Sequence, residues 1–119
     1  MGSQGSRGKL RQSRGGSEIS SSENSSKVDF VCARVLISGM VQGVGFRYFT
    51  TSTAQNHSVT GYIRNLDTGD VQIEVEGSKE EVMQFLMAVK KGPKWSHIEN
   101  FQVEWKKYEE NYDQFFVKY

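Results

Sequence analysis

The sequence has little of what metal, disulfide or nucleophile chemistry requires. Cys32 is its single cysteine, so no disulfide can form within the chain, and its place between Val31 and Ala33 predicts a buried thiol rather than a nucleophile. The two histidines, His57 and His97, have no partner at metal-ligand spacing. No apolar run is long enough for a membrane span or a signal peptide. These absences argue against a metal site and favour a reducing, cytoplasmic setting.

Apolar residues are also scarce at the start of the chain. Five glycines and nine serines make up half of residues 1–28. Such a segment buries too little apolar surface to offset the entropy of folding, so we expect a disordered tail. Its net charge is +3, and because the whole chain carries +1, residues 29–119 carry −2. Binding of the basic tail to nucleic acid or an acidic surface is one interpretation. A solvated leader is simpler, and Met-Gly-Ser is also how vector-encoded leaders begin.

Hydrophobic periodicity in residues 29–119 predicts one small α+β domain. Helices are expected over 46–56 and from the capping-box pattern at Ser78 to the stop at Gly92. Ile98 is out of phase with the fourth expected strand, which indicates a bulge or an earlier start. The strands are expected over 31–37, 59–65, 71–76, 101–105 and 115–119. The order βαββαβ predicts a ferredoxin-like sandwich: an antiparallel sheet in the order 4-1-3-2, both helices on one face, and a short extra C-terminal strand.

The third expected strand bears on one alternative function. Apolar residues alternate there with Gln72, Glu74 and Glu76, which predicts a hairpin with one face in water. RNA-binding modules share this fold, so the fold alone does not decide function. They need stacking aromatics on the inner strands and a basic surface. Outward carboxylates therefore argue against nucleic-acid binding by the sheet.

Glycines gather where the first strand meets the first helix. Gly43 and Gly45 allow positive φ values, so that successive backbone N–H groups can point into one concavity at the helix N-terminus. Arg47, one residue into the helix, can fold back and grip a phosphate or carboxylate through two N–H bonds. This pattern predicts an anion cradle. A glycine-rich connection without a ligand stays open, because the stretch lacks the third glycine of a dinucleotide fingerprint and the ending of a P-loop.

Two longer motifs carry a family resemblance. Gly39-x-Val-Gln-Gly-Val-Gly-Phe-Arg47 resembles the first signature of the acylphosphatase family, and Gly61-Tyr-Ile-Arg-Asn65-x-x-x-Gly69-x-Val71-x-x-x-x-x-Gly77 resembles the second. The resemblance runs from about Val31 to the last residue. It implies an enzyme that hydrolyses the carboxyl–phosphate bond of acyl phosphates to a carboxylate and inorganic phosphate, without metal or cofactor. It also implies that Asn65 holds the attacking water, and that the phosphoryl group is bound by Arg47 and by the backbone N–H groups of Gln42, Gly43, Val44, Gly45, Phe46 and Arg47.

The residues themselves fit a reaction that needs no enzymatic base. No serine or cysteine lies in an elbow or triad pattern, and the paired acids at 80–81 and 109–110 are typical of solvated faces. An acyl phosphate is reactive enough that a held phosphate and a positioned water suffice. The resemblance implies that a phosphate oxygen of the substrate then accepts the proton. Without the resemblance, two interpretations of Asn65 stay open: a turn residue and a catalytic residue. Whether it reaches the cradle depends on strand lengths that the sequence does not specify.

Two further functions stay open beside the enzyme. One is an acylphosphatase-like accessory domain, as found at the start of carbamoyl-transfer maturation proteins, although no second domain is expected in this chain. The other is a non-catalytic module that binds an anion or a protein through the same loop. We expect a monomer that acts on a small molecule and has neither a nucleic acid nor a membrane as partner. A loop that grips phosphate says little about the acyl group.

Overall fold

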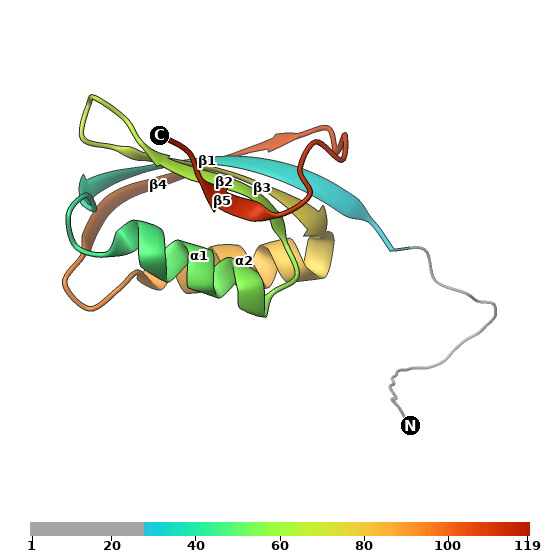
Figure 1. The fold of residues 1–119 in the computed structure, drawn as a ribbon, viewed down its shortest axis with the longest axis horizontal. Coiled ribbons are helices and arrows are strands. Elements are labelled where there is room, and N and C mark those ends of the chain that lie inside the picture. The colour runs from blue at the N-terminus through green and yellow to red at the C-terminus, as the bar shows by residue number, and fades with distance from the viewer. Residues whose placement is uncertain (1–27) are drawn as a thin grey trace, which may run out of the picture.

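The computed structural model describes residues 28–119, so the expectations for residues 1–27 lie outside the described part of the chain. The five strands form one sheet in the order β4-β1-β3-β2-β5. Figure 1 shows both helices on the same face of this sheet. The predicted ferredoxin-like arrangement with an extra strand is therefore confirmed. The elements are β1 (Phe30–Met40), α1 (Phe46–Asn56), β2 (Thr60–Asn65), β3 (Val71–Ser78), α2 (Lys79–Lys91), β4 (His97–Lys106) and β5 (Phe115–Val117).

The strand pairing is antiparallel except at one edge. β5 runs parallel to β2, with Ile63 opposite Val117, so the sheet is mixed. The bulge expected near Ile98 is present, because the β1–β4 register shifts between Ser38 and Gly39. A Cβ at Gly39 would lie 2.2 Å from the His97 carbonyl oxygen, so only glycine fits there.

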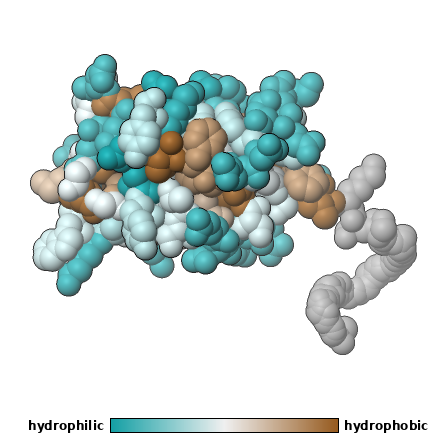
Figure 2. All heavy atoms as spheres, viewed as in Figure 1, coloured by the Kyte–Doolittle hydropathy of each residue, from teal (hydrophilic) through white to brown (hydrophobic). Residues whose placement is uncertain are grey.

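The core lies between the sheet and the two helices. Inward residues of β1 and β3 meet the predicted apolar stripe of α2, and α2 is capped by Ser78, whose Oγ accepts the Glu81 N–H at 3.3 Å. On the face drawn in Figure 2, hydrophilic side chains predominate and the apolar ones form small separate groups. None of the helices within residues 28–119 is long and apolar enough to cross a membrane. The buried side chains of the two helices are Phe46, Thr50, Thr53, Ala54, Val82, Phe85, Leu86 and Val89.

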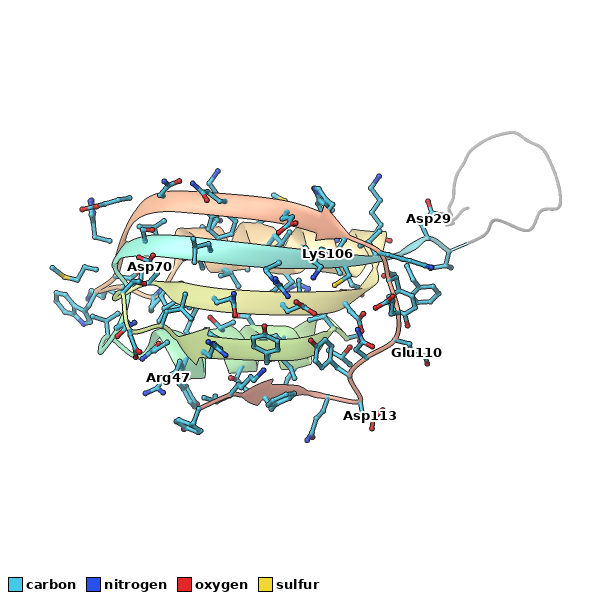
Figure 3. All side chains as sticks on the ribbon, turned by 90° about the horizontal axis from the view of Figure 1, so that it is seen from above. Asp29, Arg47, Asp70, Lys106, Glu110 and Asp113 are labelled. Carbon is cyan, nitrogen blue, oxygen red and sulfur yellow. The ribbon has the colours of Figure 1, made fainter. Side chains whose placement is uncertain are left out.

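The prediction that one face of β3 is exposed to water is wrong. Glu74 and Glu76 are only 5% and 1% exposed. Residues 107–114, called the strap below, cover them on the side of the sheet opposite the helices. In Figure 3 the strap leaves β4 near Lys106, passes Glu110 and Asp113, and returns as β5 beside β2. Alternation correctly places the two carboxylates on the outer face, but it does not reveal which segment crosses that face.

Both buried carboxylates are satisfied by hydrogen bonds. Glu76 accepts the backbone N–H groups of Glu109 at 3.2 Å and Asn111 at 2.8 Å. For Glu74 the donors are the Tyr112 hydroxyl at 2.7 Å and the Arg34 guanidinium at 2.9 and 3.1 Å. These bonds fasten the strap to β3.

Candidate active site

The loop between β1 and α1 has the backbone that its glycines predict. Gly43 and Gly45 have φ values of 75° and 79°, in the left-handed region. A Cβ at either position would meet no atom within 4 Å, so glycine is needed here for conformation rather than for space. The first helical hydrogen bond runs from the Phe49 N–H to the Gly45 carbonyl at 3.0 Å. Among residues 28–119, the preceding N–H groups of Phe46, Arg47 and Tyr48 have no hydrogen-bond acceptor.

The start of α1 is electrostatically incomplete. No side chain caps it and its first turn holds no acidic residue, whereas Arg47 adds a positive charge there. A cation at a helix N-terminus is unfavourable because the helix dipole is positive at that end. A bound anion would offset both the dipole and the guanidinium, and it would accept the free N–H groups. The local structure therefore fits the anion cradle that the sequence predicts.

One pocket of about 400 Å³ joins the cradle to the end of β2. Arg47 and Asn65 both line it, so the sequence's open question, whether Asn65 reaches the cradle, is answered by this shared pocket. Of the six residues predicted to bind the phosphoryl group, Gly43, Gly45, Phe46 and Arg47 line the pocket, and Gln42 and Val44 do not. Its complete lining is Val41, Gly43, Gly45, Phe46, Arg47, Tyr48, Thr51, Asn65, Val117 and Tyr119.

Gln42 instead has a bridging side chain. Its Nε2 donates to the carbonyl oxygens of Leu66 at 2.9 Å and Asp70 at 2.8 Å. These carbonyls belong to the turn that directly follows Asn65, and the Leu66 N–H closes this turn by donating to the Asp70 carbonyl at 2.9 Å. The side chain thus couples the cradle to the strand end that carries Asn65. The sequence motif predicts a role only for the backbone of Gln42, and this side-chain contact was not predicted.

The Asn65 side chain has an unpaired hydrogen-bond acceptor. Its Oδ1 atom is buried and has no hydrogen-bond partner among residues 28–119, a property it shares with Thr50 Oγ1. Leaving a buried acceptor unpaired costs free energy, so such an atom usually has a ligand or water as its partner. A side-chain amide can accept a hydrogen bond from a water molecule, or donate one to it, and so orient it.

β5 completes the pocket wall. Ile63 pairs with Val117, and two residues further along these parallel strands come Asn65 and Tyr119. The Arg47 guanidinium carbon lies 5.4 Å from the centre of the Tyr119 ring, close enough for a cation–π contact. Tyr48, Thr51, Val117 and Tyr119, which line the pocket, were not predicted as site residues. Helical spacing from Arg47 could have indicated Thr51, four residues later, and Tyr48 is the next residue in sequence, but Val117 and Tyr119 require the tertiary pairing.

The remaining candidates lie outside this pocket. His57 ends α1 with its Nδ1 3.4 Å from Glu81 Oε1, as expected of a residue at a helix terminus. Cys32 is a buried free thiol, as predicted. Its burial, and to a lesser extent the negative charge of Glu74 nearby, raise the pKa of this thiol to about 11. Within the described part of the chain, no group of three or more His, Cys, Asp or Glu side chains could hold a metal ion.

Comparison with known proteins gives one consistent result. The family model for acylphosphatases matches residues 33–117. An acylphosphatase of Bacillus licheniformis is 42% identical over 86 residues, which cover 72% of this chain and 96% of that protein. The crystal structure of acylphosphatase from Bacillus subtilis superposes with a TM-score of 0.72 at 34% identity, covering 75% of this chain and 99% of the other. Full-length HypF in its phosphate- and nucleotide-bound form gives a TM-score of 0.72 at 30% identity, over 80% of this chain but 12% of HypF.

Proposed function

This chain belongs to the acylphosphatase family, and from that premise we propose that it hydrolyses acyl phosphates to a carboxylate and inorganic phosphate. The observation that carries the proposal is the meeting, in one pocket, of an uncapped helix start, Arg47 and the Asn65 side chain. Each part suits one component of the reaction. The helix start and Arg47 suit the phosphoryl group, and Asn65 suits a water molecule.

The phosphoryl group binds in the cradle. The free backbone N–H groups at the start of α1 and the two-pronged guanidinium of Arg47 donate to its non-bridging oxygens. In the transition state, charge is spread over these equatorial oxygens while the bond to the acyl oxygen lengthens. Donors that are already in place stabilise this charge without reorganising. Gln42 helps by holding the turn after Asn65 against the cradle.

The water molecule is oriented by Asn65. Its side-chain amide hydrogen-bonds to the water and holds the water oxygen toward phosphorus. The new bond forms between this oxygen and phosphorus, and the bond from phosphorus to the acyl oxygen breaks. The acyl group leaves as a carboxylate with the electron pair of that bond. A non-bridging phosphoryl oxygen accepts the proton, so inorganic phosphate is the second product.

The setting of the reaction is part of the same proposal. We propose a monomeric, cytoplasmic enzyme that acts on a small-molecule acyl phosphate without metal or cofactor. Support for a reducing compartment comes from the lone, buried Cys32 thiol. The net negative charge of residues 29–119 argues against a nucleic acid, and the size of the pocket suits a small-molecule substrate.

The test is hydrolysis of acetyl phosphate and benzoyl phosphate in the presence of EDTA. We expect turnover by the wild-type chain, competitive inhibition by inorganic phosphate and no effect of the chelator. Arg47→Ala should lose both phosphate binding and turnover. Asn65→Ala should keep phosphate binding and lose turnover by about 10²–10³-fold, the usual effect of removing one positioned group.

Two matched variants control for nonspecific damage. Arg64→Ala removes a guanidinium from the same strand as Asn65, and Asn100→Ala removes an exposed amide from β4; neither residue lines the pocket. Both should retain wild-type turnover. A folded wild-type chain that binds phosphate but hydrolyses neither substrate would refute the enzyme and leave the non-catalytic anion-binding module.

A further inference from the structure

One edge of the sheet is open. The strand order begins with β4, so among residues 28–119 no strand pairs with its outer side. In Figure 3 β4 runs to Lys106 along this free edge, on the side of the sheet opposite β5. Every residue of β4 is exposed or half-buried. Such an edge offers a row of unpaired N–H and C=O groups to a strand of another chain.

The helix side of this edge is apolar. Phe101, Val103 and Trp105 pair with core residues of β1, so their side chains lie on the face that carries the helices. They extend beyond the core, since Val103 and Trp105 are 38% and 50% exposed. Beside Trp105 is a hollow of about 420 Å³, bordered by Met83 of α2, which is 41% exposed. The edge therefore combines unpaired backbone groups with uncovered apolar surface.

We propose that β4 pairs with itself: at high protein concentration it joins antiparallel to β4 of a second copy of the chain, around a two-fold axis at Val103. The two sheets then continue into one, and the apolar side chains of the two edges cover each other. This inference is independent of the proposed function. No residue of β4 lines the active-site pocket, so each chain keeps a complete site and the monomer remains the active unit.

The regular part of β4 fixes the place of the axis. The bulge leaves Glu99 out of the β1–β4 register, and the strand ends at Lys106. The regular stretch is therefore 100–106, and its central residue is Val103. A two-fold axis at this residue pairs the two regular stretches over their full length.

The side chains of β4 are complementary to themselves in this register. Trp105 lies opposite Phe101 of the second copy, which gives an aromatic pair on the helix side at each end of the paired stretch. On the other face each charged side chain lies opposite an amide: Glu104 opposite Gln102, and Lys106 opposite Asn100. No two like charges are directly opposite each other along 100–106, so the register carries no electrostatic penalty of this kind.

The neighbouring registers are less favourable. Residues directly opposite each other must share a face, so the axis has to pass through a residue rather than between two. An axis at Glu104 sets the two Glu104 carboxylates opposite each other. An axis at Gln102 extends the pairing across the bulge at Glu99. This dependence on the chain's own sequence favours a second copy over an unrelated strand as the occupant of the edge.

Sedimentation velocity of the full chain tests the self-pairing. Between roughly 1 µM and 1 mM, where small interfaces dissociate, the mean mass should rise from one chain toward two. Val103→Lys sets two like charges opposite each other at the axis, and it should raise the dissociation constant of the dimer by about tenfold or more. Because Val103 lies outside the buried core, the variant should fold, and circular dichroism checks this.

Met87→Lys is the matched control, since it also adds a lysine at an exposed apolar position. Met87 is 65% exposed on α2 and borders a groove with Phe49 and His57, away from the β4 edge. This variant should dimerise as the wild-type chain does.

Disulfide formation tests the register. Directly opposite Cβ atoms of an antiparallel pair are about 4.5–5.5 Å apart, near the span of a disulfide, whereas diagonal neighbours are about 7–8 Å apart. Mild oxidation should therefore crosslink Val103→Cys readily, but Gln102→Cys and Glu104→Cys slowly, because their copies are diagonal neighbours. The wild-type chain is the blank, since its Cys32 is buried.

Three outcomes would contradict the proposal. A wild-type chain that stays monomeric over the whole range would overturn self-pairing and leave the edge to an extended segment of another protein. Dimerisation that survives Val103→Lys, or that Met87→Lys weakens equally, would place the contact on another surface. Equal crosslinking at positions 102, 103 and 104 would refute the axis at Val103.

Discussion

Replacing Glu76 should release the strap from the sheet. Its carboxylate is 1% exposed and accepts two backbone N–H groups, from Glu109 at 3.2 Å and Asn111 at 2.8 Å. Glu76→Ala leaves both donors without a partner. An unpaired buried donor costs about 1–3 kcal/mol. Because Glu109 and Asn111 lie on an exposed segment, water will satisfy part of this loss. We therefore expect the free energy of unfolding to fall by about 2–4 kcal/mol.

Urea denaturation followed by tryptophan fluorescence measures this change. Glu76→Gln should fall between wild type and Glu76→Ala, because the amide keeps one acceptor oxygen but turns a donor toward the second N–H. Glu109→Ala is the control, since it removes a strap carboxylate and keeps the backbone N–H. Equal stability of Glu76→Ala and Glu109→Ala would refute the expected loss. It would mean that the hydrogen bonds from Glu109 and Asn111 only offset the cost of burying the Glu76 carboxylate.

The same variant also tests a link between the strap and the site. The strap leads directly into β5, and Val117 at the end of β5 and Tyr119 two residues beyond it line the pocket. Figure 3 shows β5 running from Asp113 at the strap toward the end of the sheet that carries Arg47. A loosened strap should therefore weaken substrate binding. We expect a higher KM in Glu76→Ala at temperatures where the variant is still folded, and no such change in Glu109→Ala.

Three other predictions concern single groups. Gly45→Ala meets no steric obstacle but must adopt a φ of 79°, so the free energy of unfolding should fall by about 1–2 kcal/mol in urea titrations, and phosphate should bind more weakly in calorimetry. The Cys32 thiol, with its pKa raised to about 11 by burial, should resist a disulfide reagent at pH 8 until urea unfolds the chain. Burial alone would raise the pKa of Glu74, but the hydrogen bonds from Tyr112 and Arg34 outweigh it and lower this pKa. Stability from Glu74 is thus fully present above the unfolded-state pKa of about 4.3 and is lost as pH falls from there through the lower folded-state pKa. Arg34→Met should reduce this acid sensitivity in urea titrations across pH 3–7.

Local patterns in the sequence determined most of the fold and half of the site. Alternation in β1 and β3, the stripe of α2, the cap at Ser78 and the bulge near Ile98 all follow from residues close together in the chain. The conformations of Gly43 and Gly45 were predictable for the same reason, because φ is a property of one residue and its neighbours. The cradle could therefore be predicted without any tertiary contact.

Tertiary structure decided which residues complete the site. Arg47 and Asn65 share a pocket because β2, the turn after it and the Gln42 side chain meet at one end of the sheet. Tyr119 reaches the same pocket because the strap carries the chain around the sheet to pair β5 with β2. The strap also buries the carboxylates of β3 that the sequence places in water. Such contacts depend on strand register and on the path of a connection between distant segments, which hydrophobic periodicity does not encode.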